Sequence, residues 1–389
     1  MTQKKIAITG FGALSPAGFS ASDDAFSTNP VSAIKKMLFS EKEEYAAPLT
    51  PECEAILEEI RSANPNYKRL DKAVIMAIAA GRQAVKNAGW SQCKGLAVNV
   101  GSSRGPTHAW ESFFREFEMS GSKRVSAMAS PFTTAGNIAS WVSQDIQADG
   151  LNFSHSLTCG SALHAIGNAL AWLKSGMCDR FLAGASEAPL TDFTVAQMKA
   201  LRIYSSDKTD YPCKPFNRDN NTMVLGEAAA MFCIERGENI GDAPPLAWIN
   251  GFGTYTEPIT TPTSINSDGE AFYYAMKAAA EDAGEKPDII IAHAPGTIAG
   301  DSAEWKAVEK LFNDQKPYLY SNKWQIGHTF GAAGAMNIVQ GLKILQTEEI
   351  PVFPYQLPFE QCYPKTVKNI LINVMGFGGN AVSIMLSKA

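Results

Sequence analysis

The chain has 389 residues, of which 45% are hydrophobic, so it is long enough to bury large cores and is expected to be globular. Its 34 lysines and arginines against 39 acidic residues give a net charge of −5, which offers no general attraction to nucleic acid or to an anionic membrane. Seven scattered cysteines without a C-x-x-C pair argue against a disulfide framework or a zinc site, and no apolar run reaches the roughly 18 residues of a membrane span, so we expect a cytoplasmic protein.

The N-terminal part alternates predicted strands and helices. Residues 5–9 predict a strand and residues 10–16 a close-packed tight turn. This turn superficially resembles a dinucleotide-binding fingerprint, but the third glycine and the acidic ribose partner are missing. Residues 20–66 are mixed and polar, and they predict no definite element. Further elements follow: a helix capped by Asp71 and ending near Ala88, a buried strand at 95–101, an aromatic helix with Trp110, Phe113 and Phe114, and a helix through Ile138, Trp141 and Val142.

The later chain partly repeats this pattern. Residues 246–253 echo residues 6–12, and a helix capped by Ser267 and Asp268 and ending at Ala283 precedes a strand at 288–292. The last strands are predicted at 371–374 and 381–386. The alternation predicts an α/β protein with buried, mostly parallel sheets. It also suggests an internal duplication into halves 1–245 and 246–389, with two generically similar α/β halves as the alternative.

Cys159 stands at a predicted strand-to-helix turn. It ends the run from Asn152, and the helix after it has apolar residues at helical spacing until Gly176. Free N–H groups and the positive end of the helix dipole favour a thiolate at such a position, which makes the cysteine a candidate nucleophile. The alternative is a small buried core cysteine.

Two histidines lie far downstream, each at the end of an apolar segment expected to be a strand. His293 follows residues 287–292, and His328 follows residues 321–327. Either histidine alone would be taken as structural. Together with Cys159 and the closing Gly376–Asn380 motif, in this order along the chain, they resemble the β-ketoacyl-acyl-carrier-protein synthases, the condensing enzymes of the thiolase fold. The resemblance implies two related α/β halves stacked as a layered α-β-α-β-α unit.

The resemblance also implies an activity. An acyl group would be held on Cys159, malonyl-acyl-carrier protein would lose carbon dioxide, and the resulting carbanion would attack the acyl thioester in fatty-acid or type II polyketide synthesis. The backbone amides of Cys159 and Phe377 would form the oxyanion hole. His293 and His328 would donate hydrogen bonds to the enolate oxygen, neither acting as a base. Further roles implied by the resemblance are a supporting ion pair of Lys323 and Glu304, a gate over the acyl pocket at Phe377, and a pantetheine contact at Thr297.

The implied partner is an acidic acyl-carrier protein, whose phosphopantetheine delivers the substrates, so no bound cofactor or metal is expected. Because the chain itself is net negative, docking requires a local cationic rim. The candidate residues are Lys68, Arg69, Lys123, Arg124 and Lys199. We expect a homodimer with the strand before Cys159 at the interface, and a heterodimer with a related subunit is the alternative.

Three other functions are alternatives. A thiolase would have a second cysteine in the C-terminal glycine-rich loop, and this chain has none there. A non-catalytic chain-length partner subunit would usually lack the cysteine, and a Cys-His acyltransferase or thioesterase of another fold would need only one histidine. Gly160, Pro295 and Asn380 depart from the family's usual residues, which favours a specialised ketosynthase of a polyene or type II polyketide pathway over a housekeeping enzyme.

Overall fold

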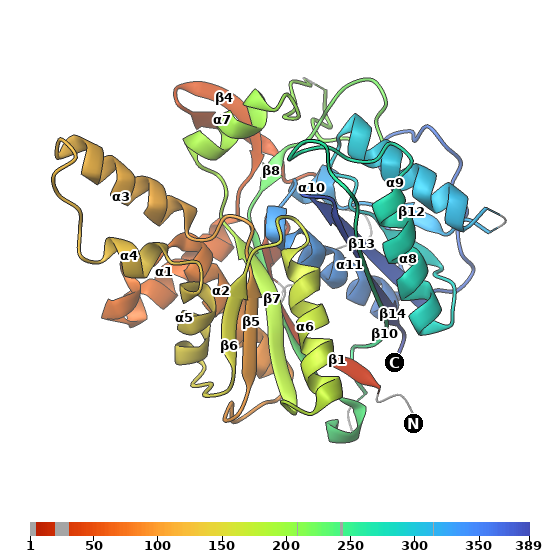
Figure 1. Ribbon diagram of the computed structural model, residues 1–389, viewed down its shortest axis with the longest axis horizontal. Coiled ribbons are helices and arrows are strands. Elements are labelled where there is room, and N and C mark those ends of the chain that lie inside the picture. Colours follow the sequence, from red (N-terminus) through yellow and green to blue (C-terminus); the bar gives the residue numbers. More distant parts are fainter. Residues whose placement is uncertain (1–4, 20–30, 208, 242–243, 314) are drawn as a thin grey trace.

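The computed structural model describes residues 5–19, 31–207, 209–241, 244–313 and 315–389, and it is built around one large mixed sheet (Figure 1). The strand order is β12-β11-β13-β14-β10-β1-β9-β7-β5-β6, and β2 pairs with β1. The strands are β1 (Ile6–Ser15), β2 (Gly18–Phe19), β5 (Ala97–Gly101), β6 (Asn152–His155), β7 (Arg180–Glu187), β9 (Ala228–Arg236), β10 (Ala247–Thr256), β11 (Ile289–Ile291), β12 (Tyr318–Tyr320), β13 (Asn369–Gly376) and β14 (Asn380–Ser387). A smaller sheet pairs β3 (Lys35–Phe39), β4 (Lys42–Ala47) and β8 (Leu225–Gly226).

Helices cover both faces of the large sheet. The α-helices are α1 (Pro51–Ala63), α2 (Lys72–Asn87), α3 (Thr107–Met119), α4 (Ala129–Thr133), α5 (Asn137–Asp145), α6 (Ser161–Ser175), α7 (Asp192–Ala200), α8 (Glu270–Ala283), α9 (Ile298–Leu311), α10 (Lys323–Ile326) and α11 (Ala333–Thr347). Short 3-10 turns are η1 (Pro65–Tyr67), η2 (Gly237–Asn239) and η3 (Phe330–Ala332). In the part of the chain that is described, no helix is long and apolar enough to cross a membrane.

The prediction of mostly parallel sheets holds only for the two outer arms of the large sheet. Strands β5, β6 and β7 are parallel in one arm, and β11, β12 and β13 are parallel in the other. The middle strands β9, β1, β10 and β14 pair antiparallel with their neighbours. The sheet is continuous because β1 and β10 pair over three residues each, Ile6–Ile8 against 247–249.

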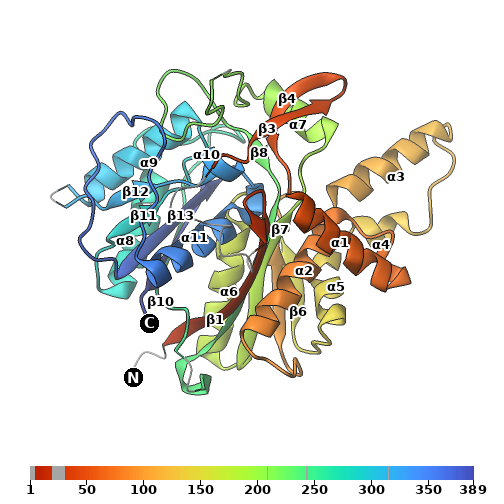
Figure 2. The same cartoon turned by 180° about the vertical axis from the view of Figure 1, so that it is seen from behind.

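Alternating residues of the strands pack on opposite layers. In β9, Phe232 and Ile234 belong to a central core shared with α6 and α11, whereas Met231 belongs to an outer core with α1, α2 and α5. In β14, Ile384 faces the same central core, and Met385 faces an outer core with α8 and α9. Because both faces of each arm are buried in this way, the molecule has the predicted α-β-α-β-α layering, visible from opposite sides in Figures 1 and 2.

Glycines in β1 and in β10 each lie close to the backbone of a neighbouring helix, in the two segments whose sequences resemble each other. Residues 10–15 continue β1 and do not form the predicted turn. A Cβ atom on Gly12 would lie 2.3 Å from the Ala80 carbonyl oxygen of α2, and one on Gly253 would lie 2.1 Å from the Ala275 carbonyl oxygen of α8. The glycines therefore allow close packing between strand and helix. The predicted close packing of residues 10–16 is confirmed, although these residues do not form a turn.

Most other local predictions agree with the structure, with two corrections. Asp71 caps α2 by accepting a hydrogen bond from the Ala73 amide at 2.8 Å. Helix α8, however, begins after Gly269 with φ +69°, and its first-turn amide at Ala271 donates at 3.2 Å to Glu257 Oε2 and not to Ser267 or Asp268. The segment before His328 is not a strand, because β12 ends at Tyr320 and α10 intervenes. Of the unassigned stretch 20–66, residues 31–66 include β3, β4 and α1, and residues 20–30 lie outside the described residues.

Candidate active site

Cys159 lies in a tight turn between β6 and α6. Ser161 fixes this turn, because its Oγ accepts a hydrogen bond from the Leu157 amide at 2.9 Å and donates to the Thr158 carbonyl oxygen at 2.7 Å. Thr158 has φ +50°, a left-handed conformation that is unusual for a β-branched residue. Such outliers persist where the surrounding structure holds them, and here the conformation presents the next residue, Cys159.

The fold brings both predicted histidines to this turn. His328 follows α10, and its Nε2 lies 3.2 Å from the Cys159 Sγ. His293 follows β11, and its ring centroid lies 5.2 Å from that of His328 at an interplanar angle of 81°. One potential ligand atom from each of the three residues lies within 4.8 Å of the others. A soft dication such as Zn²⁺ would accept these donors, but the charge of the buried Lys323 acts on all three groups and opposes a further cation.

Burial reverses the expected charge state of the cysteine. Burial and, to a smaller extent, the nearby Glu187 raise the pKa of the Cys159 thiol to about 12, and Lys323 opposes this shift. This shift is opposite in direction to the one expected from the helix N-terminus, because desolvation of the charged form outweighs it. At neutral pH the group beside His328 is a neutral thiol.

Both histidines are neutral as well. Burial, with a smaller contribution from Lys323, lowers the pKa of His328 to about 3. Burial and the neighbouring His328 also lower the pKa of His293 well below its ordinary value. Neither Nδ1 atom has a hydrogen-bond partner among the described residues. The contacts therefore leave Nε2 of each ring able to carry or accept a proton.

Two carboxylates of α9 hold the loop that carries His293. Glu304 accepts hydrogen bonds from the amides of His293 at 2.9 Å and Ala294 at 2.8 Å. One turn earlier, Asp301 accepts from the amides of Gly296 and Thr297 at 3.1–3.2 Å. Sequence reasoning missed Asp301, although its i, i+3 spacing from Glu304 puts both carboxylates on one face of the helix.

The predicted ion pair between Lys323 and Glu304 is not a direct one. Within the described residues, Lys323 Nζ instead donates to Asn337 Oδ1 at 2.7 Å and to the Ala292 carbonyl oxygen at 3.4 Å. Glu304 is linked to Asn373, whose Nδ2 donates to it at 3.1 Å. Burial lowers the pKa of Lys323 to about 8, and the Coulombic effect of Glu304 opposes this shift. The two charges thus stabilise each other through a buried amide network. Asn337 and Asn373 form this network, and the sequence analysis did not identify either residue.

The hairpin between β13 and β14 lies against the cysteine turn. Thr158 Oγ1 donates to the Phe377 carbonyl oxygen at 3.2 Å, and a Cβ atom on Gly376 would lie 3.1 Å from the Cys159 amide nitrogen. This contact brings the two predicted oxyanion-hole segments together. The Phe377 side chain is 43% exposed, and Gly378 and Gly379 follow it with φ of +91° and +76°. Such a turn suits the predicted gate, because an exposed ring between glycines is free of tight packing.

Glu187, at the end of β7, is a further buried acid at the site. Its Oε1 accepts hydrogen bonds from Ser102 Oγ at 3.1 Å and from the Ser103 amide, while its Oε2 has no partner among the described residues. Burial raises its pKa to about 7. Sequence reasoning overlooked this residue, because a single acid at a strand end has no distinctive spacing.

The predicted pantetheine contact lies next to the histidines. Thr297 is the N-cap residue of α9, four residues after His293, and its amide is held by Asp301. Pro295 and Asn380, which differ from the family's usual residues, both lie beside the site. Pro295 lies in the loop held by α9, and Asn380 Oδ1 accepts a hydrogen bond from Thr256 Oγ1 at 2.9 Å beside the Phe377 turn.

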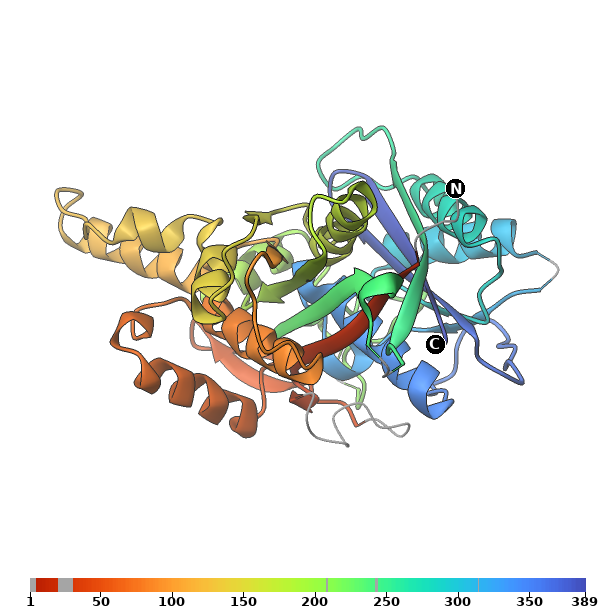
Figure 3. The ribbon, with the colours of Figure 1, turned by 90° about the horizontal axis from the view of Figure 1, so that it is seen from below.

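The predicted docking cations are exposed but do not form one cluster. Lys68 and Arg69 precede the N-terminus of α2. Lys123 and Arg124 lie between α3 and α4, a segment that forms the outermost tip of the molecule in Figures 1 and 3. Lys199 forms an ion pair with Glu44, so its charge is partly neutralised.

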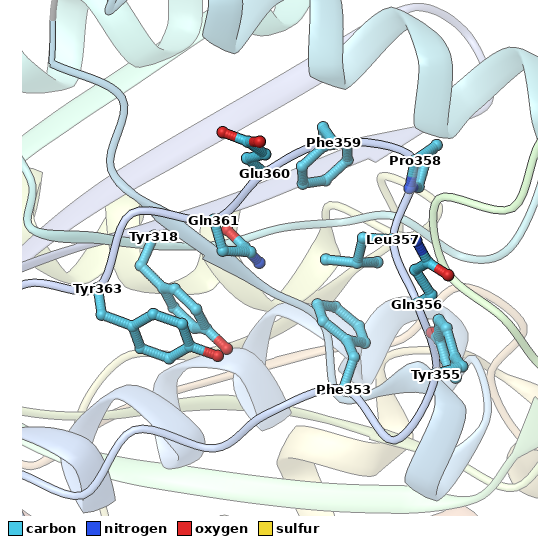
Figure 4. Close-up of a pocket in the computed structure, with 10 residues that line it drawn as sticks. All are labelled: Tyr318, Phe353, Tyr355, Gln356, Leu357, Pro358, Phe359, Glu360, Gln361 and Tyr363. Atoms are coloured by element: carbon cyan, nitrogen blue, oxygen red, sulfur yellow. The ribbon is translucent and has the colours of Figure 1, made fainter.

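One depression of about 500 Å³ lies away from this site. Figure 4 shows that the segment from Phe353 to Tyr363 curves around it, with Tyr318 of β12 on its wall. Gln361 anchors the segment, because its side chain accepts from the Leu319 amide at 3.1 Å and donates to the Leu319 carbonyl oxygen at 2.6 Å. The Gln361 side-chain amide thus pairs with backbone groups of β12 at the edge of the large sheet. None of the predicted catalytic residues lines the depression.

Comparison with known proteins agrees with this geometry. The beta-ketoacyl synthase N-terminal domain matches residues 3–239 and the C-terminal domain matches residues 246–354. The chain is 30% identical to a 3-oxoacyl-[acyl-carrier-protein] synthase 2 of Staphylococcus aureus (strain COL), over 99% of this chain and 98% of that protein. It is similar in structure to the ishigamide ketosynthase/chain length factor (TM-score 0.87, 20% identity) and to a type II polyketide ketosynthase bound to a hexaketide in complex with its acyl-carrier protein (TM-score 0.86, 20% identity), each match covering 100% of both chains.

These matches confirm the predicted resemblance and its α/β thiolase-like fold. The family models span more than half of the chain, and the relative from Staphylococcus aureus aligns over nearly all of it. The chain therefore belongs to the β-ketoacyl synthase family, whose members are condensing acyltransferases.

Proposed function

We propose that this chain catalyses the decarboxylative condensation of an acyl group on Cys159 with a malonyl group delivered on an acyl-carrier protein. The observation that carries the proposal is the contact of 3.2 Å between Cys159 Sγ and His328 Nε2, with His293 beside them. A thiol, two neutral imidazoles and two adjacent backbone segments supply a nucleophile, two hydrogen-bonding rings and an oxyanion site in one buried place.

In the acylation step the neutral thiol must lose its proton as it attacks. The Cys159 sulfur forms a bond to the thioester carbonyl carbon, and the proton passes to His328 Nε2. The carbonyl oxygen becomes negative and is stabilised by the amides of Cys159 and Phe377. When the intermediate collapses, the bond to the pantetheine sulfur breaks and that sulfur takes the proton from His328. This role as a proton acceptor goes beyond the expectation that neither histidine acts as a base.

In the condensation step no proton has to be abstracted from carbon. The malonyl carboxylate leaves as carbon dioxide, and its bonding electrons form an enolate on the thioester oxygen. Nε2–H groups of His293 and His328 donate to this oxygen. For His328 this requires the tautomer with the proton on Nε2, whereas acylation uses the tautomer with Nε2 free, and among the described residues no hydrogen bond to Nδ1 fixes either ring in one tautomer. The enolate carbon then forms a bond to the acyl carbonyl carbon, and the bond between that carbon and the Cys159 sulfur breaks. The Cys159 thiolate takes up one proton from solvent, which restores the thiol and balances the reaction.

The test is acyl-enzyme formation and carbon dioxide release. Cys159→Ala should abolish the acyl adduct in intact-protein mass spectrometry and the formation of β-ketoacyl product. Cys362→Ala is a matched control, because Cys362 is exposed and lies in the 353–363 segment away from the site. An acyl adduct that persists in Cys159→Ala and disappears in Cys362→Ala would refute the assignment.

The partners are an acyl-carrier protein and a second ketosynthase subunit. Two similar structures support this, one a ketosynthase in complex with its acyl-carrier protein and one a ketosynthase paired with a chain length factor. Phosphopantetheine would deliver both substrates, next to Thr297. Among the described strands, β6 is one edge of the large sheet, and the backbone groups on its outer side suit pairing with a second chain. We propose a homodimer through β6, and sedimentation as a monomer at micromolar concentration would contradict it.

The second candidate function is that of a non-catalytic chain-length partner. The similarity to a ketosynthase/chain length factor pair keeps this candidate open. Cys159, His293 and His328 all converge in this chain, which favours the catalytic function. We also propose that residues 1–245 and 246–389 are the two units of a duplicated fold, on the strength of the matched glycine strands at Gly12 and Gly253.

A further inference from the structure

His155, the last residue of β6, lies four residues before Cys159 and has a hydrogen-bond partner at each ring nitrogen. Its Nε2 lies 3.1 Å from the Ser161 carbonyl oxygen, and its Nδ1 lies 3.0 Å from the side-chain nitrogen of Asn99 in β5. The ring is half-buried, and burial lowers the pKa of His155 below its ordinary value, so the imidazole is neutral at neutral pH. The catalytic steps described above do not use this histidine.

These contacts fix one tautomer of the His155 ring. The Ser161 carbonyl oxygen can only accept a hydrogen bond, so the proton is on Nε2 and Nδ1 is an acceptor. The Asn99 side chain meets this requirement, because its Nδ2 donates to Nδ1 and, at 3.1 Å, to the Phe153 carbonyl oxygen. Asn99 Oδ1 accepts in turn from Asn168 Nδ2 of α6 at 3.1 Å. Asn99 is 0% exposed, and a buried network in which each polar atom has a partner holds the ring in one orientation.

Ser161 connects this network to the nucleophile turn. Its Oγ accepts a hydrogen bond from the Leu157 amide and donates to the Thr158 carbonyl oxygen, so the shape of the turn follows the position of Ser161. Its carbonyl group is packed against β5, since a Cβ atom on Gly101 would lie 2.6 Å from the Ser161 oxygen. The first turn of α6 is therefore held on two sides, by His155 at the carbonyl group and by the nucleophile turn at the hydroxyl group.

We propose that His155 is a positioning residue for the nucleophile. Through the Ser161 carbonyl group it holds the first turn of α6 where the Cys159 Sγ meets His328 Nε2. The catalytic consequence of this inference rests on the proposed condensing function. The contact between sulfur and nitrogen is 3.2 Å long, and a displacement of the turn by about 1 Å would break it. A misplacement of that size can slow a reaction by about 10²-fold.

Two substitutions of similar size separate the two ring nitrogens. The side-chain nitrogen of His155→Gln reaches about as far as Nε2 and can still donate to the Ser161 carbonyl oxygen. The amide of His155→Asn reaches only about as far as Nδ1, so it can contact Asn99 but not Ser161. A side chain that merely fills space or links β6 to β5 would make the two variants equivalent.

The experiment follows acylation of Cys159 by a two-carbon pantetheine thioester with intact-protein mass spectrometry, over a range of thioester concentrations. His155→Gln should keep the maximal rate constant within about threefold of wild type. His155→Asn should lower it about tenfold, the factor that corresponds to the loss of one hydrogen bond. The thioester concentration that gives the half-maximal rate should stay unchanged in both variants, because His155 does not touch the substrate.

A second readout does not depend on the condensing function. Alkylation of Cys159 by iodoacetamide, located by peptide mass spectrometry, also requires the thiol to lose its proton, so it should slow in His155→Asn and not in His155→Gln. Asn99→Ala removes the donor that keeps Nδ1 an acceptor, and it should slow both reactions as His155→Asn does. His108→Gln is the control, because His108 lies in α3 outside this network, and it should change neither reaction.

Thermal unfolding and sedimentation of each variant show whether it is folded and assembled as the wild type is. Equal rate constants for folded His155→Gln and His155→Asn would overturn the proposal and leave the condensing function intact. Altered sedimentation of His155→Asn would also overturn it, because the effect would then arise at the β6 edge between two chains. If His155→Asn does not fold, Asn99→Ala decides in the same way. A wild-type chain that shows the expected alkylation pattern but no acylation would contradict the condensing function alone.

Discussion

The contact between the Phe377 hairpin and the cysteine turn leads to a prediction for Gly376→Ala. The new Cβ atom would lie 1.8 Å from Thr158 Oγ1, whereas real Cβ atoms essentially never approach other heavy atoms within 3.0 Å. Either the Thr158 side chain must rotate and lose its hydrogen bond to the Phe377 carbonyl oxygen, or the two loops must separate by more than 1 Å. Because misplacement of a reacting group by about 1 Å can reduce a rate by about 10²-fold, we expect acylation of Cys159 to slow by about this factor. The strain should lower the free energy of unfolding by only about 1–3 kcal/mol.

The assay is the rate of acyl-enzyme formation with a two-carbon pantetheine thioester, together with thermal unfolding of each variant. Thr158→Ala removes the oxygen atom that the new methyl group meets, so the double variant Gly376→Ala with Thr158→Ala should recover most of the lost rate. Gly341→Ala is the packing control, because its Cβ atom would meet only side-chain ends, the nearest at 3.2 Å. A Gly376→Ala protein that acylates at the wild-type rate, or a double variant slower than the single one, would refute the reasoning.

Three more predictions concern charge and proton transfer. His328→Ala should slow both acylation and malonyl decarboxylation by about 10²–10⁴-fold, and His293→Ala should slow decarboxylation alone; equal effects of both variants on acylation would contradict the separate role of His328. Burial raises the pKa of Glu187 from 4.5 to about 7, so the folded protein holds a proton that the unfolded chain releases, and stability falls as the pH rises through this window. Glu187→Gln should therefore gain about 3 kcal/mol relative to wild type between pH 4 and pH 8 in urea unfolding, and parallel pH profiles would disprove this. Lys68→Glu with Arg69→Glu should raise the apparent KM for carrier-bound substrates and leave pantetheine thioesters unaffected, most clearly at low salt; identical salt series for the two proteins would move the docking surface elsewhere.

The sequence alone determined the chemical groups and the class of fold. Three local features were sufficient for the family resemblance: Cys159 before a periodic helix, the two histidines after apolar segments, and the glycine-rich Phe377 turn. Each of them depends on a pattern that a few consecutive residues carry. The Asp71 cap and the end of α6 at Gly176, with φ +77°, were predictable for the same reason. The repeated glycine strands were visible too, although their purpose was not.

Only the tertiary structure decided how these groups act. The contact between Cys159 and His328 joins residues 169 positions apart, and no local pattern fixes such a distance. The helix N-terminus favours a thiolate at Cys159 and desolvation favours the thiol; the sequence shows the first effect, which is local, and only the structure shows the second, which depends on everything packed around the sulfur. In the same way, Lys323 bonds to Asn337 and not to Glu304, since the geometry of a buried network is set by which strands and helices meet there.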